Sequence, residues 1–192
     1  MGDVKWSDVK RIASNEIGYH EQGNNWTKYA EELDSINYFN TPKQNIAWCA
    51  TFVAWCIYKG ADPDPKGTAL AAQYQPYKDN CGCSCKYNAQ YYRNAGEFYS
   101  EPEEGDIFFV GESGSETHQG FVLKVNGDGT ICTIEGNHDD QVTSCTRNIS
   151  QMSGFGRPWW TPEDWDVSEP NIDKDAKAAL DAIRKIIDEY YT

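Results

Sequence analysis

The pattern of apolar and polar residues separates the chain into a first part with helical spacing and a later part made of short β-type segments. The most apolar stretch spans residues 48–60, and its apolar side chains recur at the three- and four-residue spacing of a helix face. Its remaining positions are mostly apolar too, which predicts a helix buried in the middle of the fold. Shorter helices are predicted at residues 7–18, 27–33 and 86–95.

Strands are predicted at residues 105–110, 120–125, 130–135, 142–149 and 153–160. The segment Asn126-Gly127-Asp128-Gly129 is typical of a tight hairpin turn, because Asn and Gly tolerate the positive φ angles that such turns need. Successive hairpins form an antiparallel sheet. Helices followed by such strands predict the α+β class, with N-terminal helices packed on the sheet.

The composition changes near residue 160 and suggests a domain boundary there. Residues 1–160 contain all the elements named above and predict one domain. Residues 161–171 are acidic and contain two prolines, which predicts a linker. Residues 172–192 predict a C-terminal amphipathic helix with its apolar side chains on one face. That helix docks on the domain, pairs with a copy of itself or leads into a further module, and the sequence leaves these options open.

Composition and charge exclude several classes of protein. Of the 192 residues, 39% are hydrophobic, which is typical of a globular domain. The net charge of −13 argues against nucleic-acid partners and against unaided attachment to an anionic membrane or wall polymer. No run of roughly 20 apolar residues predicts a membrane span. The N-terminus also lacks the apolar run of a signal peptide, so we expect a protein that is cytoplasmic when made.

Cys49 is predicted to lie in the first turn of the central helix. Unpaired backbone N–H groups and the positive end of the helix dipole favour a thiolate there. The alternative is a small buried core residue, which is the usual fate of a free cysteine. Cys56 lies two turns later and belongs to the core in either case. The chain has seven cysteines, an odd number, and its large apolar core argues against a disulfide framework.

The segment Cys81-Gly82-Cys83-Ser84-Cys85 holds the densest group of cysteines in the chain. A structural zinc site normally needs a second pair of ligands at a matching spacing, and this sequence does not supply one. We therefore favour a thiol-rich, redox-sensitive loop over a zinc site.

The chain has only three histidines, so a cysteine–histidine pair has few possible members. A cysteine nucleophile needs an imidazole that holds the thiolate and later protonates the leaving amine, and that imidazole needs a polar partner. Because the start of one strand lies opposite the end of the next across a hairpin, His118 is brought beside Glu135 and Asn137. His138 lies beyond Glu135 and is the weaker candidate. A helix N-terminal cysteine facing such a pair is a papain-like arrangement.

Four segments, in this order along the chain, resemble the CHAP domain. This is the family of cysteine, histidine-dependent amidohydrolases and peptidases common in phage endolysins and bacterial autolysins. The resemblance extends over about residues 5–160. The segments that carry it are Trp48–Cys56, Glu104–Phe109, His118–Val122 and Ile134–Asn137.

The resemblance implies a papain-like catalytic domain at residues 1–160 and a role for each candidate residue. It implies that Cys49 is the nucleophile and that His118 is the general base and acid. It also implies that Glu135 orients His118 and that Asn137 is a further polar member of the site.

The residues before Cys49 are candidates for the rest of the site. Gln44 and Asn45 are predicted to supply an oxyanion donor, because side-chain amides can fill that role. Trp48 is predicted to belong to the same oxyanion and substrate region. Some members of the family bind calcium through an acidic loop before the cysteine. Residues 34–47 contain a single acidic residue, so no metal and no cofactor are predicted.

The predicted function is a peptidoglycan hydrolase, either an N-acetylmuramoyl-L-alanine amidase or an endopeptidase. The absence of a signal segment fits a phage-type endolysin that acts on the cell wall after release. Because the net charge opposes attraction to an anionic wall, we expect a separate wall-binding domain, joined after residue 192. Self-association through the C-terminal helix is a further possible partnership. The alternatives are a small-molecule amidase or interbacterial toxin effector on the same fold, and an inactive wall-binding module.

Overall fold

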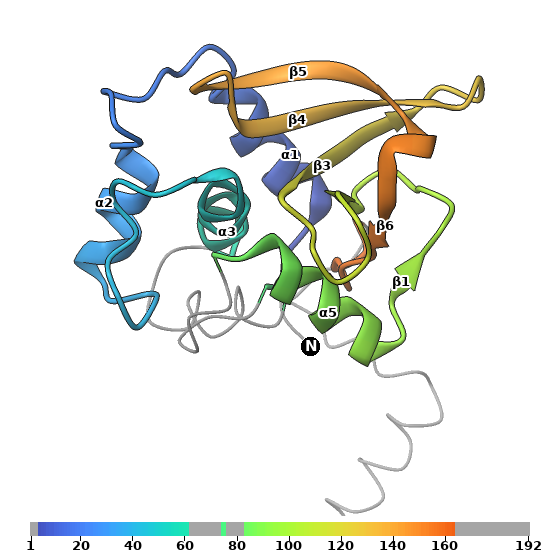
Figure 1. Cartoon of the computed structure of the whole chain (residues 1–192), viewed down its shortest axis with the longest axis horizontal. Coiled ribbons are helices and arrows are strands. Elements are labelled where there is room, and N and C mark those ends of the chain that lie inside the picture. Colours follow the sequence, from blue (N-terminus) through green and yellow to red (C-terminus); the bar gives the residue numbers. More distant parts are fainter. Residues whose placement is uncertain (1–3, 62–73, 76–82, 164–192) are drawn as a thin grey trace, which may run out of the picture. The chain divides into compact units, whose positions relative to one another are not determined.

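A computed structural model describes residues 4–61, 74–75 and 83–163 of the chain (Figure 1). The chain divides into two units, Met1–Thr161 and Pro162–Thr192, and the helices and strands described here belong to the first. The C-terminal helix predicted at residues 172–192 lies outside the described residues. So does nearly all of the linker predicted at 161–171, and both stay predictions.

The helices precede the strands along the described chain. The helices are α1 (Trp6–Asn15), α2 (Lys28–Ser35), α3 (Cys49–Gly60) and α5 (Cys85–Ala95). The strands are β1 (Phe98–Tyr99), β2 (Ile107–Val110), β3 (His118–Val125), β4 (Thr130–His138), β5 (Gln141–Asn148) and β6 (Met152–Gly156). A short 3₁₀ turn at Ile149–Gln151 joins the last two strands. None of the described helices has both the length and the apolar character needed to cross a membrane.

The strands form one antiparallel sheet in the order β1-β6-β2-β3-β4-β5. Strands β3, β4 and β5 are long neighbours across one side of the unit in Figure 1. Helices combined with an antiparallel sheet confirm the predicted α+β class. The sequence does not predict β1, because two residues are too few to show a period.

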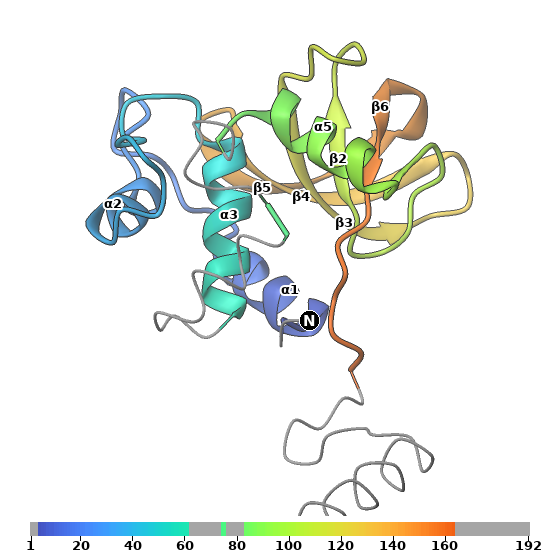
Figure 2. The same ribbon diagram turned by 90° about the horizontal axis from the view of Figure 1, so that it is seen from below.

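Helix α3 is buried along almost its whole length, with every residue from Cys49 to Tyr58 shielded from solvent. It packs against β3 and β4, and also contacts α1 and α2 (Figure 2). Its side chains are apolar nearly all round, so no face of the helix needs contact with water. The prediction of a central buried helix is therefore confirmed.

Apolar residues on the strands divide between two clusters, because successive side chains point to opposite faces of a sheet. Phe109 and Phe121 belong to the large core that the sheet shares with the helices. Phe108 and Val122, one position away on the same strands, belong to a smaller cluster on the other face. The sheet is therefore apolar on both faces, and polar side chains between the apolar ones need partners within the protein.

The ends of the helices follow local sequence rules only in part. The Thr27 hydroxyl accepts a hydrogen bond from a backbone N–H of α2 at 3.2 Å and caps that helix. Gly96 ends α5 in the left-handed conformation, with φ 77°. The first helix begins at Trp6 and not at the predicted Ser7, and Lys5 at the capping position makes no side-chain cap.

Gly136 lies where β4 approaches α3 closely. A Cβ atom at this position would lie 2.6 Å from Cβ of Phe52 and 2.8 Å from Cζ3 of Trp48. Because Cβ of Phe52 is attached directly to the helix backbone, it cannot move aside unless α3 moves. We expect Gly136→Ala to lower the free energy of unfolding by about 1–3 kcal/mol, as overpacking of a core usually does.

Urea denaturation measures this loss. Ser144→Ala is the control, because Ser144 is exposed on the neighbouring strand β5 and its truncation should change stability by less than about 0.5 kcal/mol. If the Gly136→Ala protein were as stable as the parent, α3 and β4 could move slightly apart without a loss of stability, which would contradict the prediction.

Candidate active site

Cys49 is the first residue of α3 and is 5% exposed. The first backbone N–H groups of a helix have no acceptor within the helix, and they mark the positive end of its dipole. A negative charge on the Cys49 sulfur is therefore favoured by the helix that carries it. The thiol lies where the sequence predicts it, in the first turn of the central helix.

His118 is the first residue of β3, and its Nε2 lies 2.7 Å from Oε2 of Glu135 in β4. Val122 and Thr133 are paired across these two strands. Because His118 is four residues from Val122 and Glu135 is two residues from Thr133, the four side chains share one face of the sheet. This is the contact that the hairpin predicts. With Nε2 on Glu135, the other ring nitrogen remains for Cys49.

Glu135 is fully buried and accepts hydrogen bonds on both carboxylate oxygens. Arg147 of β5 donates from Nε to Oε1 at 2.6 Å and from Nη2 to Oε2 at 2.5 Å. Thr133 and Cys145 also donate to Oε1. Burial alone would raise the pKa of this carboxyl, but Arg147, His118 and the other donors hold it well below its usual range. Glu135 is therefore a carboxylate that is fixed in position.

Arg147 is not among the site residues predicted from the sequence. Strand alternation puts Thr143, Cys145 and Arg147 on one face of β5. The pairing of Glu135 with Thr143 shows that this is also the face of Glu135. Because that pairing depends on how β4 and β5 meet, the only signal in the sequence is a basic residue inside a predicted strand.

Cys49 and His118 each shift the pKa of the other toward its charged form. Hydrogen bonding to the Cys85 thiol lowers the pKa of Cys49 well below its ordinary value against the effect of burial, and His118 and a backbone bond to Gln119 lower it further. Burial opposes a charged imidazole, but Cys49 and Glu135 together raise the pKa of His118 to about 9. Between these two pKa values, thiolate and imidazolium coexist, so the Cys49 sulfur is ionised over that range of pH.

A chain of buried side-chain amides joins the elements around Cys49. Gln75 donates to the backbone carbonyl of Ala50 in α3 at 2.9 Å. Gln119 of β3 donates to Gln75 at 3.1 Å, and Asn88 of α5 donates to Gln119 at 2.8 Å. No motif in the sequence marks these amides, since each is an ordinary polar residue until the fold brings them together. They hold the starts of α3, β3 and α5 at fixed separations.

Gln44 and Asn45, the predicted oxyanion residues, are bound to the segment at residues 24–27. The Gln44 amide donates to the carbonyl of Thr27 at 2.7 Å and accepts from its N–H at 3.0 Å. Asn45 is exposed, and its side chain accepts from Asn24 at 3.4 Å. These bonds fix the loop before Cys49. The Gln44 amide nitrogen carries two N–H groups, and the bond to Thr27 uses one of them. The second N–H is left for an oxyanion, and this role of Gln44 stays a prediction.

Trp48 and Asn137 make contacts away from the imidazole. Trp48 is fully buried, and its Nε1 donates to Glu21 at 2.9 Å, so contact with a substrate would require its neighbours to move. The Asn137 side chain donates to Asn25 at 3.5 Å and makes no hydrogen bond to His118 in the structure. The roles predicted for both residues stay predictions.

Glu135, His138 and Cys145 are the one group within the described ranges with ligand atoms close enough together to hold a metal ion. Both oxygens of Glu135 already accept from Arg147. A cation at this point would therefore meet the positive guanidinium. The Glu135–Arg147 ion pair therefore explains this group of side chains better than a bound metal does. The prediction of a metal-free site stays a prediction.

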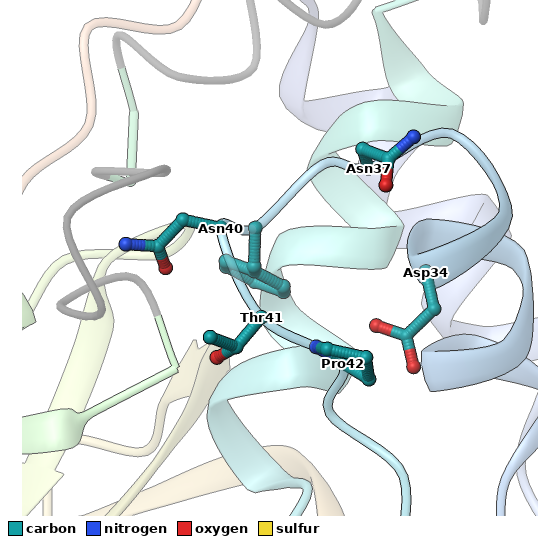
Figure 3. A pocket seen from close by; sticks show the side chains of 6 residues that line it. Asp34, Asn37, Asn40, Thr41 and Pro42 are labelled. Atoms are coloured by element: carbon teal, nitrogen blue, oxygen red, sulfur yellow. The ribbon is translucent and has the colours of Figure 1, made fainter.

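A cavity beside α2 lies apart from these residues (Figure 3). Both carboxylate oxygens of Asp34 accept from the backbone N–H of Lys43, at 2.9 and 3.0 Å, so this acidic side chain holds its own loop. No predicted site residue lines the cavity. The lining residues are Asp34, Asn37, Phe39, Asn40, Thr41 and Pro42.

Replacing Arg147 by leucine is expected to lower the free energy of unfolding by about 3–5 kcal/mol at neutral pH, because it leaves the buried charge of Glu135 without its bidentate partner. The pKa of Glu135 is lower in the folded state than in the unfolded state. Its contribution to stability is therefore present above the unfolded value of about 4.3 and is lost as the pH falls. Urea denaturation should give a smaller difference from the parent at about pH 3 than at about pH 7.

Arg11→Leu is the matched control, because the Arg11 side chain and its partner Asp8 are 64% and 45% exposed. Its effect should stay below about 1 kcal/mol. If Arg147→Leu and Arg11→Leu proved equally mild, Glu135 would not be a buried carboxylate that depends on Arg147.

Comparison with known proteins agrees with this arrangement. The family model of the CHAP domain matches residues 37–137, which is just over half of the chain. The matched range contains Cys49, His118 and Glu135. No curated protein matches the sequence. The resemblance inferred from the sequence segments is thereby confirmed.

Proposed function

Because the chain belongs to the CHAP domain family of amidases and peptidases that act on peptidoglycan, we propose that it hydrolyses amide bonds of the cell wall through Cys49. The observation that carries the proposal is the 2.7 Å contact between His118 and Glu135 beside a thiol whose pKa is lowered. A cysteine, a base and a group that orients the base are the parts that nucleophilic amide hydrolysis needs.

In the first half of the reaction, the Cys49 sulfur attacks the carbonyl carbon of the scissile amide and forms a tetrahedral oxyanion. The carbon–nitrogen bond then breaks, and the imidazolium of His118 gives its proton to the leaving amine. The products of this half are a free amine and a thioester on Cys49. Because His118 is already protonated at neutral pH, the proton is available when the leaving group departs.

In the second half, neutral His118 takes a proton from water, and the resulting hydroxide attacks the thioester carbon. The carbon–sulfur bond breaks, the carboxylic acid product leaves, and the Cys49 thiolate and the His118 imidazolium are restored. Glu135 keeps the imidazole in one orientation in both halves, and Arg147 keeps Glu135 in place. Arg147 is thus a positioning residue and not a catalytic one.

The oxyanion is proposed to form beside the backbone N–H of Cys49, at the N-terminus of α3, where helix N–H groups have no acceptor within the helix. Gln44 is the proposed second donor, through the N–H that is not used on Thr27. Asn137 and Trp48 are proposed to support the substrate side of the site from further away.

The proposed setting is a phage-type endolysin that reaches the wall after release from the cytoplasm. The net charge of −13 opposes attraction to anionic wall polymers. We therefore propose attachment through a separate wall-binding domain. Self-association through the C-terminal helix is proposed independently of wall attachment.

Digestion of purified cell walls, followed by mass spectrometry of the released fragments, tests the proposal. New amino and carboxyl termini on wall fragments are expected, and their position identifies the cleaved bond. Cleavage between muramic acid and L-alanine would indicate an amidase, and cleavage within stem or cross-bridge peptides an endopeptidase. Intact walls after digestion would contradict the proposal and favour a small-molecule amidase, a toxin effector or an inactive binding module.

A further inference from the structure

A second thiol lies against the proposed nucleophile. The Sγ atoms of Cys49 and Cys85 are 3.6 Å apart, and the two residues are 5% and 6% exposed. Each is the first residue of its helix, α3 and α5, so two helix N-termini meet at this pair of sulfur atoms. Cys85 helps to lower the pKa of Cys49, but it forms and breaks no bond in the proposed hydrolysis. All cysteines of the described ranges are free thiols.

We propose that Cys49 and Cys85 form a reversible disulfide bond, and that this bond is a modification site that turns the enzyme off and protects its nucleophile. Cys85 belongs to the cysteine-rich segment at residues 81–85, and the proposed hydrolysis does not explain why the chain carries that segment. The sulfur atoms are in contact but not bonded, and a disulfide would bring them to about 2.05 Å. Only a short movement of the two sulfur atoms therefore separates the reduced site from the disulfide-bonded one.

The oxidant we name is a peroxide. The Cys49 thiolate attacks one peroxide oxygen, the oxygen–oxygen bond breaks, and the products are a sulfenic acid on Cys49 and, after protonation, water. The sulfur of Cys85 then attacks the sulfur of Cys49. The sulfur–sulfur bond forms, the sulfur–oxygen bond breaks, and the hydroxide leaves as water with the Cys85 proton. Two thiols are oxidised to one disulfide, and hydrogen peroxide is reduced to two waters.

The pKa shifts of Cys49 and Cys85 favour oxidation of Cys49 first and attack by Cys85 second. In the reduced site, the hydrogen bond to Cys49 and burial both raise the pKa of Cys85, so Cys85 is a neutral thiol next to a thiolate. Cys49, which His118 and Cys85 hold as the thiolate, is the sulfur that meets the oxidant first. Conversion of Cys49 to the sulfenic acid removes the negative charge that keeps Cys85 protonated. Cys85 can then act as the resolving thiol.

Peptide mapping of the full chain tests the disulfide directly. Reduced protein is treated with equimolar hydrogen peroxide, remaining thiols are blocked with iodoacetamide, and the protein is digested under non-reducing conditions. We expect a cross-linked peptide pair that contains Cys49 and Cys85, lighter by two hydrogen atoms than the separate peptides. Cys49 found unlinked, or linked to Cys83, would overturn the proposal. This readout does not depend on what the enzyme cleaves.

Turnover supplies the second readout, and it rests on the proposed function. The parent should lose wall hydrolysis after peroxide and regain it fully with dithiothreitol. Cys85→Ser lacks the resolving sulfur, so in excess peroxide a second peroxide molecule should oxidise its Cys49 sulfenic acid to the sulfinic acid and leave as water. Dithiothreitol does not reduce the sulfinic acid. Its activity, relative to its own reduced form, should stay lost.

Cys83→Ser is the matched control, because Cys83 lies two residues from Cys85 and should not be needed for recovery. Equal recovery of the Cys85→Ser variant and the parent would overturn the proposal. If the reduced parent did not digest walls at all, the proposed function would fail, while the cross-link found by mapping would still decide the disulfide.

Discussion

Replacement of Cys49 by alanine is expected to lower the rate of wall hydrolysis by at least about 10³-fold, because removal of the nucleophile from such a catalytic group usually has an effect of this size or larger. No thioester can form without the sulfur, and His118 alone offers no route of comparable rate. The loss of turbidity of cell-wall suspensions, at matched concentrations of folded protein, measures the change.

Cys56→Ala is the control for this experiment. Cys56 lies on the same helix and is fully buried, and burial raises the pKa of its thiol well above the ordinary value. Its truncation should lower stability by about 1 kcal/mol, as removal of a small buried group does, and leave turnover per folded molecule unchanged. A Cys49→Ala variant that clears walls as fast as the parent would rule out the proposed mechanism.

The second large effect is expected at His118. His118→Asn should reduce turnover by about 10²- to 10⁴-fold, because it removes both the acid that protonates the leaving amine and the base that activates water. It should also move the alkylation of Cys49 by iodoacetamide to higher pH. The imidazolium contributes to the lowered pKa of Cys49, and without it the pKa moves back toward its ordinary value.

Alkylation of Cys49 and turnover in the parent protein should each depend on pH, with a different limit for each. Because the pKa of Cys49 is lowered, alkylation should continue below the ordinary thiol pKa of about 8.5 and stop only as the pH falls through the lowered value. Turnover should decrease at the alkaline end, as the pH rises through the raised pKa of His118 at about 9, because the imidazolium that protonates the amine is lost.

His138→Asn is the matched control, since His138 is the alternative base at the end of β4 and its nearest ion-pair partner is the exposed Asp139 at 3.7 Å. It should keep the turnover and the alkylation profile of the parent. The assignment of roles would be reversed if His138→Asn lost activity and His118→Asn kept it.

Much of the fold was predictable because its signals are local. The apolar stretch at residues 48–60 has no polar face, so it forms a helix that must be covered on all sides. The predicted strands around the turn at residues 126–129 form the β3–β4 hairpin, and their pairing brings His118 to Glu135. Short-range spacing determines each of these features, and no distant part of the chain is needed to infer them.

The side chains packed around Cys49 and Glu135 were only partly predictable. The side chains that surround Cys49 and Glu135 include Arg147 and Cys85. Arg147 belongs to no motif, and the cysteine-rich segment that contains Cys85 does not show that it meets Cys49. Arg147 reaches Glu135 only because β5 pairs with β4 in the observed register. Trp48, predicted near the substrate, is fully buried because it packs between other aromatic side chains of the core.

The sequence by itself determined the α+β class, the family, the buried central helix and the meeting of His118 with Glu135, since periodicity and hairpin geometry act over a few residues. Only the tertiary structure decided which groups control the charges in the site. Burial and distance set the pKa of Cys49, and both depend on residues from α5 and β3 that are far away along the chain. A thiol at a helix start is a candidate nucleophile by position. The imidazole and the second thiol packed against it determine its charge and, in our proposal, its control.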